Sequence, residues 1–236
     1  MLYIIGLGLN EKGISIEGKE ILEKCKKIYL ENYTIEFPYK LNKLEKITGK
    51  KINILDRRYV ESDKLILEAK KDDIALLIYG SPLSATTHII LIEECIEKKV
   101  KYKVVYSGSV LDAVAESGLQ LYKFGKIASM PLWKNNFKPE SFLDLIKENQ
   151  SIGAHSLILI DIGLNLINAL NQLSESSKIK DINIDKILVC SQLGIKNKFF
   201  YEKINELKDK KIKNPFCFII PGKMHFLEEK MIERFK

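Results

Sequence analysis

The chain has 236 residues, of which 46% are hydrophobic and 29% charged, and its formal net charge is +7. This composition is typical of a folded protein with one or two domains and excludes a disordered chain. No apolar window reaches the length of a membrane helix, and the N-terminus lacks the basic region and cleavage site of a signal peptide, so we expect a cytoplasmic protein without membrane association.

Strands and helices are predicted to alternate through the first half of the chain. Apolar runs predict strands over residues 1–9, 27–34, 51–56, 73–80 and 102–108. Helical spacing predicts helices over residues 15–27, 40–48, 61–72 and 85–99. The first of these should bury Ile16, Ile21, Leu22 and Cys25 on one face, and Ser62 should cap the third. Alternation with continuous apolar strands predicts a mostly parallel sheet with helices on both faces.

The second half is predicted to form another α/β domain with a mixed sheet. A helix broken at a glycine is expected over 109–125, and further helices over 139–153 and 164–177. Strands are expected over 126–132, 155–163, 185–194 and 216–223, with a helix or an edge strand over 199–211. Turn chemistry near residues 106–109 indicates domains spanning 1–108 and 109–236.

The stretch IIGLGLN places Gly6 and Gly8 at the end of the first strand. A dinucleotide fingerprint would need a third glycine at position 11, which is Glu11, and an acidic residue after the second strand, for which Glu31 is a weak candidate. A nucleotide-dependent oxidoreductase is therefore disfavoured. The two glycines still predict that another group lies close to the backbone at the carboxyl end of the strand.

The stretch YGSPLSATTH follows the buried fourth strand and leads into a helix. Its hydroxyls at Ser84, Thr86 and Thr87 could cap that helix, which accounts for one or two of them but not for the run. SGSV, at residues 107–110, ends the fifth strand in the same way. Three small turns at one edge of a sheet predict a shared ligand, and the absence of a P-loop lysine disfavours a nucleoside triphosphate.

Cysteine, histidine and lysine positions give weaker indications. The four cysteines form no C-x-x-C pair and the three histidines have no metal-ligand spacing, so we expect small buried cysteines and no metal site. Lys-rich stretches such as KDKKIKNP favour a solvated surface, with an acidic or nucleic-acid-bound partner as the alternative. No RNP motif, zinc finger or Arg-rich arm indicates direct nucleic-acid binding.

Four blocks give the chain a family resemblance. Residues 1–34, YGSPLSATTH, GLQLYKFG and IIPGKMHFLEE together resemble the diphthine synthases, which are diphthamide-pathway methyltransferases of the tetrapyrrole-methylase type. The resemblance implies two α/β domains, with S-adenosylmethionine (SAM) in the cleft between them, and a homodimer. It implies methylation of the amine of a 3-amino-3-carboxypropyl group on a histidine of translation elongation factor 2, the protein partner.

The same resemblance implies cofactor contacts at particular residues. They are Leu9, Ser81, Ser84, Ser109 and Val110, to which the body of the second domain adds Ile160, Leu193 and Phe216. We name no catalytic base, because a sulfonium donor is already activated and the protein mainly aligns the reactants. Tyr122 and Lys123 could orient the acceptor, but packing and a surface lysine are favoured. His88 is expected to be a first-turn helix residue.

This sequence departs from the family pattern at several of these positions. The family usually has Asp where Ser81 stands, His at the position of Phe216, and Arg-Ala-Gly in place of residues 192–194. Losing the Asp removes an ionised acceptor near a cationic ligand. Two alternatives therefore stay open: a methyltransferase acting on a tetrapyrrole, and a diverged member that binds elongation factor 2 without catalysis. The blocks GLQLYKFG and PGKMHF favour the protein-modifying branch.

Overall fold

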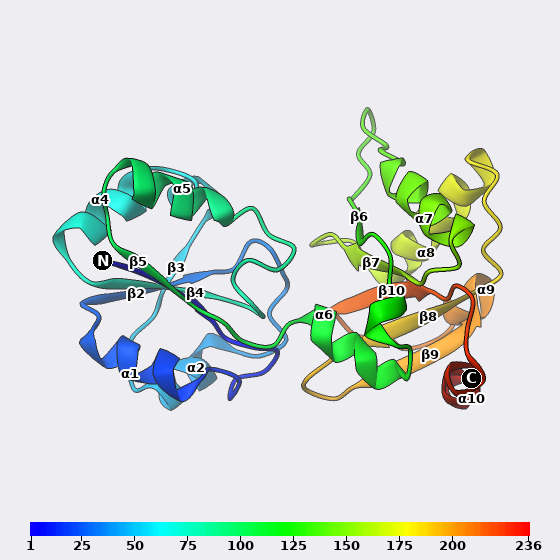
Figure 1. Ribbon diagram of the computed structural model, residues 1–236, viewed down its shortest axis with the longest axis horizontal. Helices are drawn as coiled ribbons and strands as arrows, with labels where there is room; N and C mark the ends of the chain where they lie inside the picture. Colours follow the sequence, from blue (N-terminus) through cyan, green and yellow to red (C-terminus); the bar gives the residue numbers. More distant parts are fainter. The chain divides into compact units, whose positions relative to one another are not determined.

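The computed structural model describes residues 1–236, and the chain divides into two compact units, Met1–Leu111 and Asp112–Lys236. The sequence placed a domain boundary after residue 108. Each unit is an α/β layer structure with its own sheet and its own hydrophobic core (Figure 1).

The first unit contains a parallel five-stranded sheet in the order β3-β2-β4-β1-β5. Its strands are β1 Leu2–Gly6, β2 Lys27–Glu31, β3 Asn53–Leu55, β4 Ile74–Ile78 and β5 Tyr102–Val105. Its helices are α1 Ile16–Lys24, α2 Leu41–Thr48, α3 Arg57–Val60, α4 Lys64–Lys71 and α5 Ile89–Glu97. The predicted parallel sheet is confirmed.

Burial explains why the central strand is apolar throughout. All five residues of β4 are buried, because α4 and α5 cover one face of the sheet and α1 and α2 lie on the other (Figure 1). Leu65, Ile66 and Leu91 pack from α4 and α5 onto Leu76 in one core. A strand that is covered on both faces has no solvent-exposed side chains, which agrees with its continuous apolar sequence.

Two local predictions for this unit are wrong. Leu22 and Cys25 are buried as predicted, but Ile16 is 81% exposed, and Gly18 is the other residue of α1 that is buried. A Cβ on Gly18 would lie 3.1 Å from Ile5 Cγ2, so glycine permits a close helix–strand approach. Ser62 is not the N-cap of α4, which is Asp63; the Ser62 hydroxyl accepts the Lys64 N–H at the start of α4 at 3.4 Å and donates to the Tyr59 carbonyl at the end of α3.

The second unit contains a mixed five-stranded sheet in the order β6-β7-β10-β8-β9. Only β6 and β7 pair in parallel, so the predicted mixed sheet is confirmed. Its strands are β6 Ala128–Met130, β7 Ser156–Ile160, β8 Lys186–Ser191, β9 Lys198–Lys203 and β10 Phe216–Ile220. Its helices are α6 Val110–Ala113, which begins at the end of the first unit, α7 Ser141–Ser151, α8 Leu166–Ile179, α9 Ile204–Leu207 and α10 Phe226–Ile232, with short 3₁₀ turns at Val114–Ser117, Leu121–Lys123 and Glu233–Phe235.

The core of this unit lies between the sheet and the helices α7 and α8. Phe218 in the central strand β10 is fully buried and belongs to the same cluster as Ile146 of α7 and Leu170 of α8. Residues 199–211 hold both predicted alternatives, because the edge strand β9 is followed by the short helix α9. Helix α10 was not predicted.

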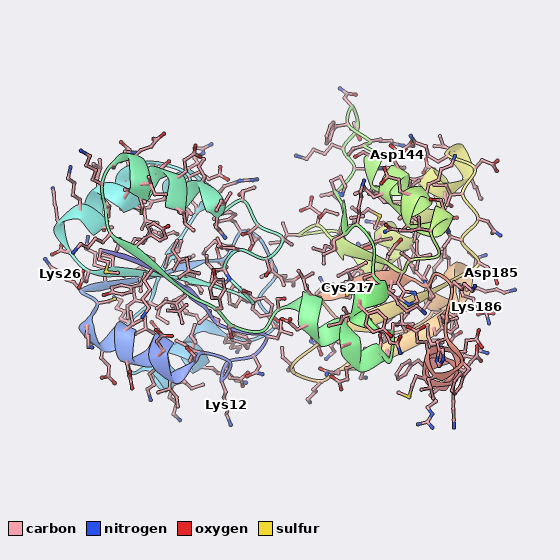
Figure 2. The ribbon with its side chains drawn as sticks, in the orientation of Figure 1. Lys12, Lys26, Asp144, Asp185, Lys186 and Cys217 are labelled. Carbon is pink, nitrogen blue, oxygen red and sulfur yellow. The ribbon has the colours of Figure 1, made fainter.

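The positive charge lies on the surface of the molecule. Figure 2 shows the side chains of Lys12, Lys26 and Lys186 at the periphery, whereas Cys217 lies inside the second sheet. All four cysteines are buried and free, as predicted. In residues 1–236, the helices are all too short or too polar to cross a membrane.

Candidate functional site

Three loops meet at the carboxyl edge of the first sheet because the strands before them are neighbours. β4, β1 and β5 lie side by side and run in parallel, so the segments after Ile78, Gly6 and Val105 emerge at the same edge. Gly8 and Gly80 exchange backbone hydrogen bonds of 3.2 and 3.0 Å, which ties the first loop to the second. The shared edge predicted from the sequence is confirmed.

Gly6 is the point of closest approach. A Cβ there would lie 2.7 Å from the Gly80 carbonyl oxygen, 2.9 Å from Pro82 Cδ and 3.0 Å from Ser107 Cβ. The loops after β4 and β5 therefore both press against the Gly6 α-carbon, and any side chain there would have to displace the Gly80 carbonyl. The Ser107 hydroxyl also donates to the Gly13 carbonyl at 3.0 Å, which fastens the third loop to the first.

The five sequence-predicted contact residues of this unit fall in these loops or, for Val110, directly after the third loop. Leu9 is half-buried, and its carbonyl accepts a 2.8 Å hydrogen bond from the Tyr79 hydroxyl. Ser109 is buried and accepts from the Leu111 N–H at 3.1 Å, while Val110 begins α6. The side-chain hydroxyls of Ser81 and Ser84 are half-buried and have no protein partner, so both are free to bind a ligand.

The hydroxyls of residues 84–87 do not cap helix α5. The N-cap position is His88, and no side chain caps the helix there. Thr86 bonds within its own loop, donating to the Pro82 carbonyl at 3.0 Å and accepting from the His88 N–H at 3.4 Å. The capping explanation of this polar run is therefore wrong, because the helix begins only at Ile89.

His88 holds this loop from inside the unit, a role that the sequence did not indicate. Its side chain is 2% exposed, and Nδ1 lies 3.3 Å from the Pro82 carbonyl, which can only accept, so Nδ1 donates. Nε2 lies 3.4 Å from the Tyr33 hydroxyl and 3.5 Å from the fully buried Glu31 carboxylate. Burial lowers the pKa of His88, against the opposing charge of Glu31, so the ring is neutral.

Glu31 in turn organises the end of β2. Its carboxylate accepts the backbone N–H groups of Tyr33 and Thr34, at 3.0 and 2.9 Å, and the Thr34 hydroxyl. These bonds satisfy a carboxylate that has no contact with water. Glu31, a weak candidate for the acidic residue of a dinucleotide fingerprint, is thus an internal support for the loop through His88.

An aromatic cluster lies beside the first loop. Phe37, Tyr39 and Tyr79 pack with ring centroids 5.4–6.3 Å apart. Burial raises the pKa of both tyrosines, so they remain neutral. The Tyr39 hydroxyl is buried without a hydrogen-bond partner. These rings give the loop edge an apolar wall that residue spacing did not predict.

The three predicted contact residues of the second unit share one edge of its sheet. Ile160 ends β7, Phe216 begins β10, and Leu193 follows β8. Because β10 runs antiparallel to both neighbours, its first residue lies at the edge where they end. Leu193 is buried, and Phe216 packs on Phe218 with a centroid distance of 5.5 Å.

Neither expectation for Tyr122 and Lys123 matches the structure. Tyr122 is 82% exposed rather than packed, and Lys123 forms an ion pair with the buried Glu228 rather than standing free on the surface. Nowhere in residues 1–236 do three His, Cys, Asp or Glu side chains gather in an arrangement that could hold a metal ion.

The fold and the loop edge define a family. The model of the tetrapyrrole (corrin/porphyrin) methylases matches residues 1–208, and the chain belongs to this family. The diphthine synthase of Methanocaldococcus jannaschii is 38% identical over 97% of this chain and 96% of its own length, which places the protein with the diphthine synthases. A crystal structure of an Entamoeba histolytica protein assigned as a diphthine synthase covers 100% of this chain and 98% of its own, at a TM-score of 0.91 and 32% identity.

Eukaryotic relatives match over a shorter segment. The diphthine methyl ester synthase of Schizosaccharomyces pombe is 44% identical over 165 residues, which are 69% of this chain and 58% of that protein. The chain therefore matches less than two thirds of the length of that relative.

Replacing Gly6 by alanine tests the meeting of the three loops. We expect Gly6→Ala to lower the free energy of unfolding by about 1–3 kcal/mol, because the methyl group must displace the Gly80 carbonyl. Gly108→Ala is the matched control, since a Cβ there meets nothing within 4 Å, and its stability should stay within about 0.5 kcal/mol of the parent. Urea denaturation followed by circular dichroism measures both, and equal losses would contradict this account.

Replacing His88 by asparagine tests its buried neutral state. The folded pKa of His88 lies below the unfolded value of 6.5, so below about pH 6.5 only the unfolded chain takes up the proton and stability falls as the pH drops. His88→Asn keeps a donor near the Pro82 carbonyl but cannot titrate. Between pH 7 and pH 5 its free energy of unfolding should decline less steeply than that of the parent, by up to about 1.4 kcal/mol per pH unit. An identical slope would show that His88 does not titrate differently in the two states.

Proposed function

We propose that the protein is a SAM-dependent methyltransferase of diphthamide biosynthesis. Its acceptor would be the amine of the 3-amino-3-carboxypropyl group on a histidine of translation elongation factor 2. The observation that carries this proposal is the likeness to the M. jannaschii diphthine synthase, which extends through both units. A likeness confined to the first unit would support only the cofactor site. The likeness to the M. jannaschii protein covers 97% of this chain and so includes the second unit.

The loop edge of the first unit fits the proposed cofactor. The Ser81 and Ser84 hydroxyls have no protein partner, and the space beside Gly108 is open within 4 Å. We propose Leu9, Ser81, Ser84, Ser109 and Val110 as cofactor contacts, and Ile160, Leu193 and Phe216 as contacts contributed by the second unit. A cationic ligand with an amino-acid end suits hydroxyl oxygens and backbone carbonyls that accept hydrogen bonds.

The chemistry asks for alignment more than for acid–base groups. SAM supplies an activated methyl group, which an amine takes by in-line displacement when its nitrogen is neutral. The residues of this chain would orient the two partners and exclude water. The loop edge would serve that purpose because the Gly8–Gly80 hydrogen bonds and the close contact at Gly6 restrict its backbone conformation.

Elongation factor 2 is the proposed protein substrate, and the basic surface would favour docking on an acidic partner. A homodimer remains a prediction from the resemblance, and a cytoplasmic location remains a prediction from the N-terminal sequence and the apolar windows. Light scattering coupled to gel filtration would test the first of them.

The mass of the treated substrate tests the reaction. Incubating the protein with SAM and elongation factor 2 bearing the aminocarboxypropyl histidine should raise the factor's mass in steps of one methyl group. The amine nitrogen becomes a quaternary ammonium after three methyl groups and can accept no more. A fourth methyl group that mild alkali removes would therefore be a carboxylate ester. This distinction matters because relatives carry both names, diphthine synthase and diphthine methyl ester synthase.

Two results would contradict this proposal. No mass gain together with methylation of a tetrapyrrole would favour the small-molecule alternative. Failure to bind S-adenosylhomocysteine in calorimetry, with elongation factor 2 still bound, would favour the non-catalytic one.

Ser81→Asp tests the departure from the family pattern. A carboxylate in the half-buried position of Ser81 should tighten SAM binding by about threefold to tenfold, because an ionised acceptor would face a cationic ligand. Ser81→Asn has the same size without the charge and is the control. Titration calorimetry with SAM measures all three proteins; unchanged or weaker binding in Ser81→Asp would remove Ser81 from the site.

A further inference from the structure

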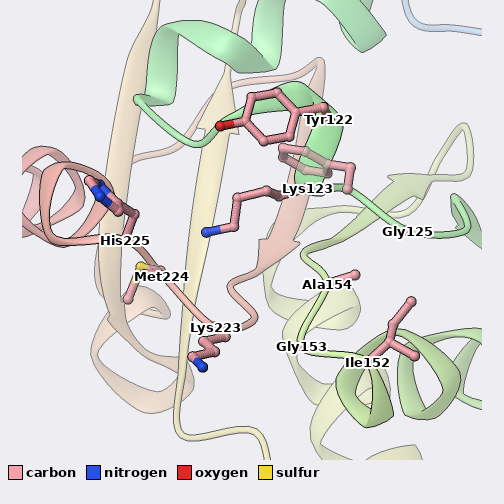
Figure 3. A pocket seen from close by; sticks show the side chains of 10 residues that line it. Tyr122, Lys123, Gly125, Ile152, Gly153, Ala154, Lys223, Met224 and His225 are labelled. Carbon is pink, nitrogen blue, oxygen red and sulfur yellow. The ribbon is translucent and has the colours of Figure 1, made fainter.

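The second unit has an open pocket of about 510 Å³ that lies among three separate segments. The segments are Tyr122–Gly125, Ile152–Ala154 and Lys223–His225, and Figure 3 shows them facing one another around the cavity. None of the cofactor contacts proposed above belongs to this pocket. Two of the segments belong to GLQLYKFG and PGKMHF, blocks to which the loop edge of the first unit gives no role.

One buried carboxylate holds the three segments together. Glu228 is 0% exposed, and its Oε1 accepts the Gln120 N–H at 2.9 Å and the His155 Nε2–H at 3.1 Å. Its Oε2 accepts the His225 N–H at 2.7 Å and the Lys123 ammonium. Each segment, or the residue beside it, therefore bonds to the same side chain.

The hydrogen bonds also define the protonation state of His155 and Glu228. His155 Nδ1 accepts the Gly222 N–H at 2.8 Å, so the ring proton is on Nε2, where it is donated to Glu228. Burial lowers the pKa of His155, which stays neutral. Burial alone would raise the pKa of Glu228, but the His225 N–H, the Lys123 ammonium and the other donors outweigh it and hold the pKa at about 2.

Glycines let the backbone segments pack tightly around this carboxylate. A Cβ on Gly222 would overlap the carbonyl oxygens of Gly153 and Ala154, and one on Gly125 would overlap the side-chain oxygen of Asn149. Gly153 has a φ of +70°, which favours glycine. These contacts restrict the backbone conformation of the pocket walls, which lowers the ordering cost of binding a partner.

The surface of the pocket combines exposed apolar side chains with a free positive charge. Tyr122 and Ile152 are 82% and 77% exposed, and Phe226, the next residue after the third segment, is 66% exposed. Glu228 compensates the charge of Lys123, whereas Lys223 is exposed and has no carboxylate partner among residues 1–236. Apolar anchors beside a cation suit a partner segment that carries an apolar side chain next to an acidic one.

We propose that this pocket is the docking site for an acidic, apolar segment of the protein substrate. The inference rests on the proposed function, since it requires a macromolecular acceptor. A pocket of this size accepts a few side chains rather than a whole domain face. A second copy of this chain is a poorer occupant, because it would bring another surface of a protein with a net charge of +7 to an uncompensated lysine.

A double variant with a matched control tests the site. Lys223→Glu combined with Ile152→Ala removes the cation and the apolar anchor, and both side chains are exposed, so the fold should be retained. Lys211→Glu combined with Ile179→Ala makes the same changes elsewhere in the second unit, at an exposed loop lysine and at an exposed isoleucine that ends a helix. Elongation factor 2 bearing the aminocarboxypropyl histidine is the probe.

We expect the pocket variant to raise the KM for the factor at least about tenfold, with kcat and S-adenosylhomocysteine affinity unchanged, whereas the control variant keeps the parental KM. Equal KM values for the two variants, with the parent active, would overturn the docking site and leave the proposed function intact. A parent protein that does not methylate the factor would overturn both. A pocket variant whose mass in light scattering drops from dimer to monomer would assign the pocket to a second copy and overturn the proposal.

Discussion

The close contact of Gly6 with the loops after β4 and β5 is the constraint on which the first unit depends. Parallel strands deliver their loops to one edge of the sheet, but only bare α-carbons let those loops touch. The Gly80 carbonyl occupies the space that a Cβ at position 6 would need, and the Gly8–Gly80 hydrogen bonds fix the same pair of loops from the next residue. The proposed cofactor residues of the first unit lie in the loops that this contact holds together.

The loops of the second unit are held by hydrogen bonds to the buried Glu228 carboxylate as well as by close backbone contacts at glycines. Glu228 collects donors from segments more than a hundred residues earlier in the chain, and an unpaired carboxylate at that depth would cost several kcal/mol. The donors therefore depend on one another, because removing one of them leaves the buried Glu228 carboxylate with fewer hydrogen bonds to offset its burial. The first unit has a smaller version of this arrangement, in which Glu31 and His88 support the polar loop from inside.

The departures from the family pattern at Ser81 and Phe216 differ in their structural surroundings. Ser81 stands in a loop whose backbone is fixed by its neighbours, so exchanging it for Asp changes the charge there without requiring a new loop conformation. Phe216 is a different case, because its ring packs on Phe218 and so contributes to the core as well as to the sheet edge. A change at position 216 would combine packing and binding effects, which makes Ser81 the cleaner of the two to interpret.

The sequence by itself determined the order of the elements apart from helix α10, the parallel first sheet and the mixed second one, and the gathering of three small turns at one edge. These follow from apolar periodicity and glycine positions, which act over short distances along the chain. Tertiary structure alone decided that Ile16 faces water, that the Thr86 hydroxyl bonds a loop carbonyl instead of a helix end, and that His88 and Glu228 are buried supports. The partner of a buried polar group lies far away in sequence, so only the packing of distant segments selects it.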